Sequence, residues 1–206
     1  MSLTHARPSP VIRLGSGTNE SISVWVGANG TAQKIATREI EEILATYTEA
    51  QLSTVFMQER TEGAHQFLEI HLPDQTIVFD AAASQALGQP VWFFLRSSVV
   101  GLGRWEVCDA IWCYDRWNVC KPGETDVGFL DKNVATHWGQ TVGWEFGTMI
   151  LYNEGRGAIV HELELVSLTG RVQPGADPTV WTSYSVDGLT YSVEKPARVG
   201  TLGQYD

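Results

Sequence analysis

The chain has 206 residues, of which 24 are acidic and 14 basic, and its formal net charge is −10. Hydrophobic residues make up 43% of it, including 8 tryptophans, a composition that excludes a disordered chain. Nucleic-acid binders cluster their positive charge, so the dispersed lysines exclude tight direct DNA binding. No apolar run approaches the roughly 20 residues of a membrane span, and no signal peptide is evident. The lysines are Lys34, Lys121, Lys132 and Lys195.

A chain of this length can form one large all-β domain or two smaller ones. It buries roughly 70% of its unfolded surface, so its core needs no metal or disulfide staple. The three cysteines, Cys108, Cys113 and Cys120, do not have the paired C-x-x-C spacing of a zinc site. We therefore expect them to be reduced and structural, although one disulfide is compatible with the count.

The first elements are predicted to be strands at residues 11–14 and 21–26. Asn29 and Gly30 favour a hairpin turn from the second strand into residues 31–36. A helix over residues 37–47 follows, with Thr37 placed to cap it. Its apolar residues recur at helical spacing and predict one buried face. These residues are Ile40, Ile43, Leu44 and Tyr47.

Thr48 and Gln51 have the spacing of a capping box, which predicts a second, shorter helical turn. Alternating apolar and polar residues then predict an antiparallel meander. Its four strands are expected at residues 53–60, 64–72, 75–80 and 91–95. A helix that leads into a meander is a scaffold pattern and has no evident active-site signature.

A second meander of similar size is predicted from residues 105–114, 117–120 and 127–131. Two successive meanders of about 40 residues are typical of propeller blades, which resemble one another in structure more than in sequence. The predicted fold class is therefore all-β, a partial β-propeller of such meanders with one short amphipathic helix.

The C-terminal part has a different character. Strands are predicted at residues 143–152 and 158–168, and the second has the cleanest alternation in the chain. Residues 180–195 are predicted to form a hairpin, with Asp187 and Gly188 at the centre of a type I′ turn. Together these strands suggest a small β-sandwich-like module.

We expect a propeller-like domain at residues 11–135 and the sandwich-like module at residues 136–206, with the boundary between 132 and 140. Residues 1–3 (MSL) have the character of an expression-vector remnant, and the chain stops soon after a turn-like sequence. We therefore expect it to be the C-terminal portion of a longer protein, with a truncated last module.

His65, Glu69 and His71 are the residues closest to a metal-ligand pattern. On a regular strand they share a face, but at about 3.3 Å per residue they spread over about 20 Å, too far for one ion. The favoured interpretation is a solvated face opposite Leu68 and Ile70. No catalytic, cofactor-binding or metal-binding residue is assigned in the chain.

Acidic residues are plentiful, but the sequence places no two of them across a cleft as a glycosidase requires. They are Glu106, Asp109, Glu145, Glu162 and Glu164. The segment SVDGLTY (residues 185–191) is similar to the Asp-box of sialidase propellers, which is a structural turn. Nucleophile-elbow, P-loop and Rossmann signatures are absent. The tryptophans are expected in the core and in subunit interfaces more than on a sugar-binding platform.

Three segments carry a family resemblance: IATREIEEILATYTEAQL (35–52), HLPDQTIVFDAAASQ (71–85) and SYSVDGLTY (183–191). They resemble the packaged-DNA stabilisation proteins of short-tailed phages, also called tail accessory factors or tail hub proteins. The resemblance implies a structural, non-enzymatic protein without cofactors, which closes the portal channel and stabilises packaged DNA.

The resemblance also implies partners: a portal or adaptor ring, a tail needle, and tailspike or fibre proteins. It implies a sixfold homo-oligomeric ring in the virion tail, with assembly in the host cytoplasm and no membrane association. An acidic wall suits this role because it repels DNA. The alternatives are a carbohydrate-binding or glycosidase-like β-propeller module and a propeller module of a bacterial surface protein.

Overall fold

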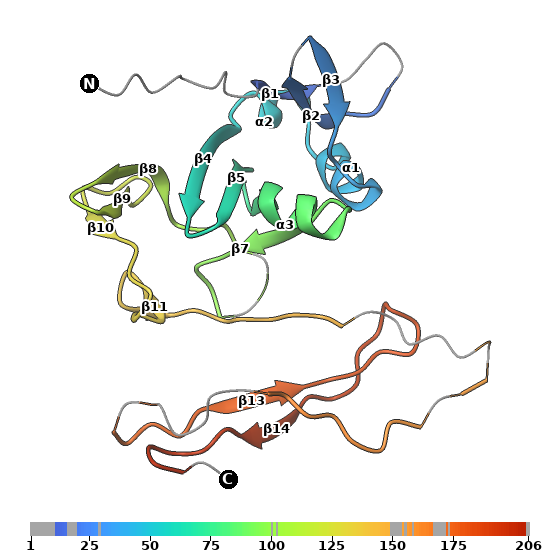
Figure 1. Ribbon diagram of the computed structural model, residues 1–206, viewed down its shortest axis with the longest axis vertical. Coiled ribbons are helices and arrows are strands. Elements are labelled where there is room, and N and C mark those ends of the chain that lie inside the picture. Colours follow the sequence, from blue (N-terminus) through green and yellow to red (C-terminus); the bar gives the residue numbers. More distant parts are fainter. Residues whose placement is uncertain are drawn as a thin grey trace. The chain divides into compact units, whose positions relative to one another are not determined.

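The computed structural model describes residues 11–15, 20–28, 30–99, 101, 103–148, 154, 156–157, 159–166, 172 and 174–204. The chain divides into two compact units, residues 1–147 and residues 148–206 (Figure 1). The described part is built mostly from short antiparallel strands. None of its helices is long and apolar enough to cross a membrane.

The first unit begins with a three-stranded sheet in the order β1-β2-β3. Its strands are β1 (Val11–Gly15), β2 (Ser23–Ala28) and β3 (Thr31–Lys34). Ala28 pairs with Thr31, and Gly30 has a positive φ of 81°, as a tight hairpin turn requires. Both predicted strands are therefore confirmed, whereas Asn29 of the predicted turn lies outside the described residues.

The predicted helix is confirmed as α1 (Arg38–Ala45), with Ile40 and Leu44 buried. Thr37 is its N-cap residue, but the Thr37 side chain accepts no capping hydrogen bond. The capping box of Thr48 and Gln51 is present and starts α2 (Glu49–Leu52). The structure thus has more helix than the single one that the fold prediction counted.

A third helix, α3 (Ala81–Leu87), was not predicted. The carboxylate of Asp80 accepts a hydrogen bond from the Ala83 amide at 3.0 Å, which caps the N-terminus of α3. Gly88, with a φ of 69°, ends the helix in the left-handed conformation. The segment between the strands predicted at residues 75–80 and 91–95 therefore contains a helix that is capped at both ends.

The four-strand meander is confirmed as a sheet in the order β4-β5-β6-β7. Its strands are β4 (Phe56–Glu62), β5 (His65–His71), β6 (Thr76–Asp80) and β7 (Trp92–Leu95). One face of this sheet packs on α1 and on β2. That core includes the fully buried Val24, Leu44, Ile70 and Ile77.

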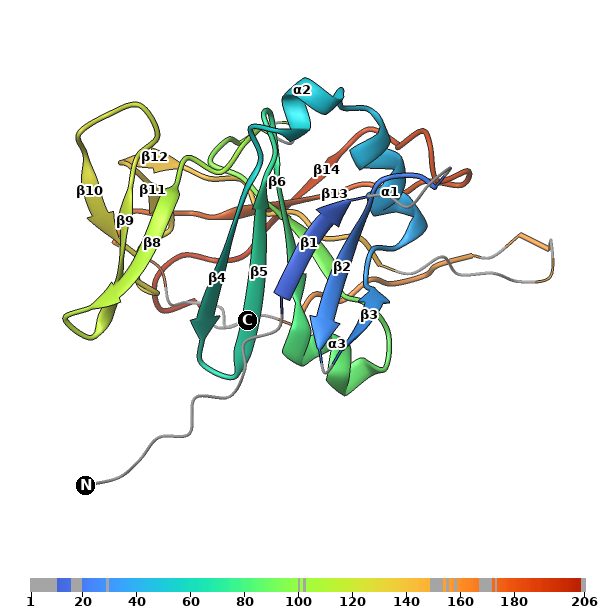
Figure 2. The same ribbon diagram turned by 90° about the horizontal axis from the view of Figure 1, so that it is seen from above.

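The second meander is also confirmed, as a sheet in the order β10-β9-β8. Its strands are β8 (Cys108–Cys113), β9 (Arg116–Cys120) and β10 (Val127–Phe129). A small core of Trp105, Val107 and Val119 lies beneath it. Two short strands, β11 (Thr136–His137) and β12 (Gln140–Thr141), follow. Figure 2 shows the three main sheets one after another, with β4 to β6 in the middle.

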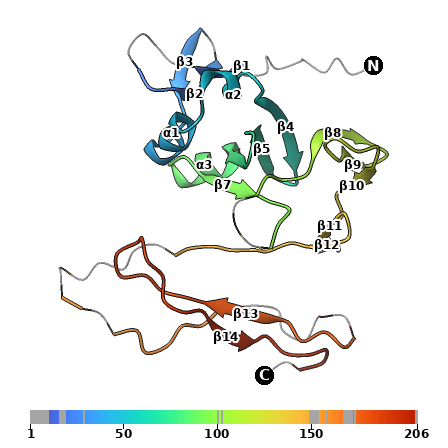
Figure 3. The same ribbon diagram turned by 180° about the vertical axis from the view of Figure 1, so that it is seen from behind.

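Among the residues of the second unit that the structure describes, β13 (Thr179–Thr182) and β14 (Lys195–Arg198) form a pair of regular strands (Figure 3). The predicted hairpin is therefore confirmed, with a further bridge between Ser185 and Tyr191. Its predicted type I′ turn is wrong, because Gly188 has a positive φ of 74° but Asp187 does not.

The strands predicted at residues 143–152 and 158–168 are wrong where the structure describes them. Residues 143–148 and 159–166 have no strand conformation, and residues 149–153, 158 and 167–171 lie outside the described residues. A strand needs a hydrogen-bonded neighbour, and no described strand pairs with residues 159–166. Their apolar side chains are exposed, with Ile159 at 82% and Leu163 at 71%.

Candidate interaction surface

The polar face of the β4–β7 sheet is buried. Glu69 is 0% exposed and His71 is 1% exposed, although both carry polar side chains. Nε of Arg60 donates to Oε1 of Glu69 at 2.7 Å, and Gln58 donates to Oε2 of the same carboxylate at 2.5 Å. The predicted solvated face is therefore wrong for Glu69 and His71, while His65 is half exposed.

The β8–β10 meander explains this burial, because it lies against the polar face of β4 and β5. Trp105 stacks near the His71 ring with centroids 6.0 Å apart. Oε1 of Gln58 accepts a hydrogen bond from the Ala110 amide at 3.1 Å. The Trp117 indole donates to the Thr61 carbonyl at 2.8 Å. The two meanders thus pack face to face through a polar and aromatic interface.

Glu69 is held as an ion in this interface. Burial acts to raise its pKa, but the neighbouring His71, the charge of Arg60 and hydrogen bonds from Arg60 and Gln58 together lower it. Its two oxygens are both engaged by protein donors. Within the described residues no group of three or more His, Cys, Asp or Glu side chains is placed to hold a metal ion.

The opposite face of the β8–β10 sheet carries exposed apolar side chains together with Asn118 and Arg116, whose guanidinium carbon lies 4.3 Å from the centre of the Phe129 ring. The strand register places Ile111, Asn118 and Phe129 in one row across the sheet, and Cys108, Cys120 and Val127 in another. Both rows face away from the buried Val119 because side chains alternate along a strand. Ile111 is 65% exposed, Val127 70% and Phe129 50%. We call the face made by Ile111, Val127 and Phe129 the outer meander face.

The cysteines lie on the same side of this sheet and are free and half-buried. Burial, followed by the charge of Asp109, raises the pKa of the Cys108 thiol. A raised pKa lowers the thiolate fraction, so Cys108 is a poor nucleophile. Cys108 therefore has the character of a structural residue.

The tryptophans divide between core and surface. Trp105 is 3% exposed and Trp92 packs against the main core, as the sequence analysis expected. Trp112 is 55% exposed, Trp144 76% and Trp181 59%. These three indoles are available for contacts with other molecules.

The second unit has a large exposed apolar surface. Among its described residues none of the apolar side chains is buried. Val186 is 92% exposed, Val193 87% and Tyr191 69%. A sheet normally buries one face against another layer, so these described residues present a surface suited to contact with a further layer.

The loop around Asp187 is a structural turn. Its carboxylate accepts hydrogen bonds from the amides of Leu189 and Thr190, both at 2.8 Å, and from the hydroxyls of Ser185 and Thr190. The Thr190 hydroxyl and these amides hold the pKa of Asp187 well below its usual value. The carboxylate therefore fixes the loop, as the Asp-box similarity suggested.

The acidic residues considered for glycoside hydrolysis are all exposed: Glu106, Asp109, Glu145, Glu162 and Glu164. Glu145 lies 3.4 Å from Nη2 of Arg96. The network of Gln58, Arg60 and Glu69 was not among the features predicted from the sequence. A signal for this network was present in the sequence, because these charged and amide residues occupy alternate positions on two adjacent predicted strands.

These features define an all-β protein of stacked antiparallel sheets with exposed apolar surfaces. A family model described as the bacteriophage P22 Gp10 β-propeller matches residues 9–135, and a second, described as the P22 Gp10 β-sandwich, matches residues 143–206. The chain belongs to the bacteriophage P22 Gp10 family. The predicted all-β fold class and the resemblance to phage tail hub proteins are thereby confirmed.

The chain is also similar to the tail hub protein gp10 of Salmonella phage P22. The two are 29% identical over 178 residues, which cover 84% of this chain and 35% of that protein. The chain thus spans about a third of the length of this curated relative. The compact units divide after residue 147, and the family models leave residues 136–142 unmatched, so the boundary after residue 135 stays a prediction.

Proposed function

We propose that this chain is a structural, non-enzymatic part of a phage tail hub, which closes the portal channel and stabilises packaged DNA. The observation that carries the proposal is that both family models match this chain, the β-propeller model first and the β-sandwich model after it. The name of the P22 relative, a tail hub protein, supports a location in the virion tail. We also propose that the protein assembles in the host cytoplasm.

The proposed mechanism is mechanical. Packaged DNA presses outward, and a ring of subunits resists because many subunit contacts must fail together. The proposed ring has six copies and contacts a portal or adaptor ring, a tail needle, and tailspikes or fibres. The outer meander face and the exposed apolar side chains of the second unit support such contacts, because apolar surface of this kind marks interaction sites.

The charge of the chain supports a wall for DNA more than a DNA-binding surface. A net charge of −10 repels phosphate groups and lets DNA pass without adhering. We further propose that the propeller-like domain ends at residue 135 and that the sandwich-like module begins at residue 136. Limited proteolysis that cuts near this position would support the boundary.

Complementation of a phage that lacks the gene tests the function. We expect particles without the protein to package DNA and then lose it, measured as DNase-sensitive genome in purified particles. Wild-type protein and the surface variant Glu59→Gln should both restore retention, because Glu59 is exposed on β4. Full genome retention without the protein, or hydrolysis of a glycan by the purified chain, would contradict the proposal.

A further inference from the structure

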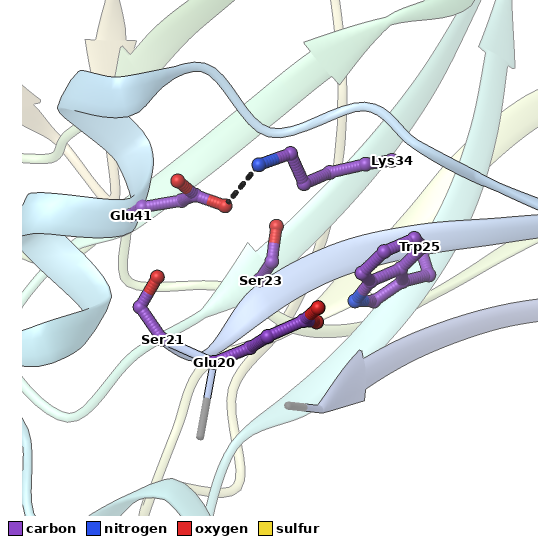
Figure 4. Close-up of a pocket in the computed structure, with 6 residues that line it drawn as sticks. All are labelled: Glu20, Ser21, Ser23, Trp25, Lys34 and Glu41. Carbon is purple, nitrogen blue, oxygen red and sulfur yellow. Dashed lines mark ion pairs between the residues drawn. The ribbon is translucent and has the colours of Figure 1, made fainter. Parts of the chain in front are cut away.

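A polar pocket of the first unit lies beside β2, but its groups satisfy one another. Figure 4 shows the Lys34 ammonium directed at the Glu41 carboxylate, from which it lies 3.0 Å. The hydrogen bond from Lys34, and after it the Ser23 hydroxyl, lowers the pKa of Glu41. The Glu20 carboxylate that remains is exposed and by itself points to no ligand. The unassigned chemistry of this unit lies instead in the thiols of the second meander.

Cys108 and Cys120 lie directly opposite one another on β8 and β9. Opposite residues of an antiparallel pair have Cα atoms about 4.5–5.5 Å apart, which is within the about 4.4–6.8 Å that a disulfide spans. Sγ of Cys108 lies 3.6 Å from the backbone carbonyl oxygen of Cys120, so this thiol is already directed at its cross-strand neighbour. Both thiols are free and only half-buried, which leaves them within reach of a small reagent.

A β-bulge produces this pairing. On β9, Asn118 and Cys120 are two residues apart and share a face. Their partners on β8, Ile111 and Cys108, are three residues apart and would point to opposite faces of a regular strand. The register shifts between Cys108 and Ala110, and the inserted Asp109 has a φ of 51°, which is uncommon for a residue other than glycine. The bulge therefore turns the Cys108 side chain to the face of Cys120.

The third cysteine is placed outside this pair. Cys113 lies at the far end of β8, roughly 15 Å from Cys108 at about 3.3 Å per residue. Its register partner on β9 is Arg116, and the Asn118 side-chain amide donates to its Sγ at 3.1 Å. The fold thus selects one pair out of three thiols and supplies Cys113 as an internal control.

We propose that Cys108 and Cys120 form a disulfide in an oxidising environment, with oxidised glutathione as the oxidant. One protein thiolate attacks the glutathione disulfide and releases one glutathione, and the second protein thiolate then displaces the other glutathione from the mixed disulfide. The protein gives up two protons and two electrons, and one glutathione disulfide becomes two thiols. The passage of the protein from a reducing cytoplasm to oxidising surroundings rests on the proposed function, whereas the pairing of these thiols does not.

The test is oxidation of the dilute, folded full chain with excess oxidised glutathione, followed by alkylation and mass spectrometry. The incubation is mildly alkaline, because the raised pKa of Cys108 slows exchange near neutrality. We expect a loss of two hydrogens within one chain and one alkylated cysteine in place of three. Non-reducing peptide maps should join the Cys108 segment to the Cys120 segment, and reduced glutathione should reverse the bond.

Two variants and an unfolded control set the interpretation. Cys113→Ser should form the same bond as the wild type, whereas Cys108→Ser should form no disulfide within the folded chain. In concentrated urea the three thiols should give a mixture of links, because the register of the sheet is lost. Three free thiols, separate glutathione adducts, bonds between two chains, or the same mixture of links in the folded chain as in urea would overturn the inference. The genome-retention assay would still decide the proposed function, whatever the state of the thiols.

Discussion

Replacing Arg60 by methionine tests the buried network between the two meanders. Its guanidinium bonds to Glu69 at 2.7 Å, and the two side chains are 6% and 0% exposed. Arg60→Met leaves a carboxylate buried without its cation, which costs about 3–5 kcal/mol. We expect the lower end, about 3 kcal/mol, because Gln58 still donates to Glu69.

A matched control is Arg38→Met on α1. Arg38 also bonds to a carboxylate, Glu42, at 2.9 Å, but these side chains are 86% and 65% exposed. Water screens such a pair, so its loss should cost less than about 1 kcal/mol. Urea unfolding followed by tryptophan fluorescence at pH 7 measures both variants.

The pH dependence adds a second check. In the wild type the pKa of Glu69 lies below its ordinary 4.5, so its contribution to stability is present above that value and is lost as pH falls through the lowered pKa. In Arg60→Met the burial of Glu69 dominates and raises the pKa of its carboxyl group. The loss of unfolding free energy relative to wild type should therefore be smaller at pH 5 than at pH 7. A cost no larger than that of Arg38→Met, or a deficit independent of pH, would refute the reasoning.

Three further changes have distinct expected results. Leu44→Ala, at a fully buried position, should cost about 2–5 kcal/mol in urea unfolding, whereas Leu87→Ala, 65% exposed, should cost less than about 0.5 kcal/mol; equal costs would contradict the assigned core. Asp187→Asn should speed hydrogen exchange of the two loop amides that the Asp187 carboxylate holds, whereas the control Glu194→Gln should not. In the wild type the protection of these amides should persist as the pH falls below 3.8, the ordinary pKa of an aspartate, since the pKa of Asp187 is lowered. Ile111→Arg should leave unfolding within about 0.5 kcal/mol of wild type but reduce incorporation into tails; unchanged incorporation would argue against the outer meander face.

The sequence predicted the local elements of the first unit well, because their signals are local. Alternation located β4 to β10, and the capping box at Thr48 located α2. The missed helix α3 has only 7 residues, and most of them are alanine or leucine, so its sequence AAASQAL shows no helical alternation of apolar and polar residues. Only its cap residue, Asp80, and Gly88 mark its ends.

Predictions that depended on long-range packing were less successful. His71 and Glu69 were expected in solvent because alternation shows that two faces differ, but not that a second sheet covers the polar one. Residues 159–166 alternate cleanly but form no strand, because pairing requires a neighbour that alternation cannot supply.

The central claim is that the chain is a stoichiometric building block of a phage tail, and quantitative mass spectrometry of purified virions tests it directly. Peptides from this chain, counted against a major capsid protein of known copy number, should give a constant number of copies per particle, about six for the proposed ring. Absence of the chain from purified infectious virions would contradict the claim.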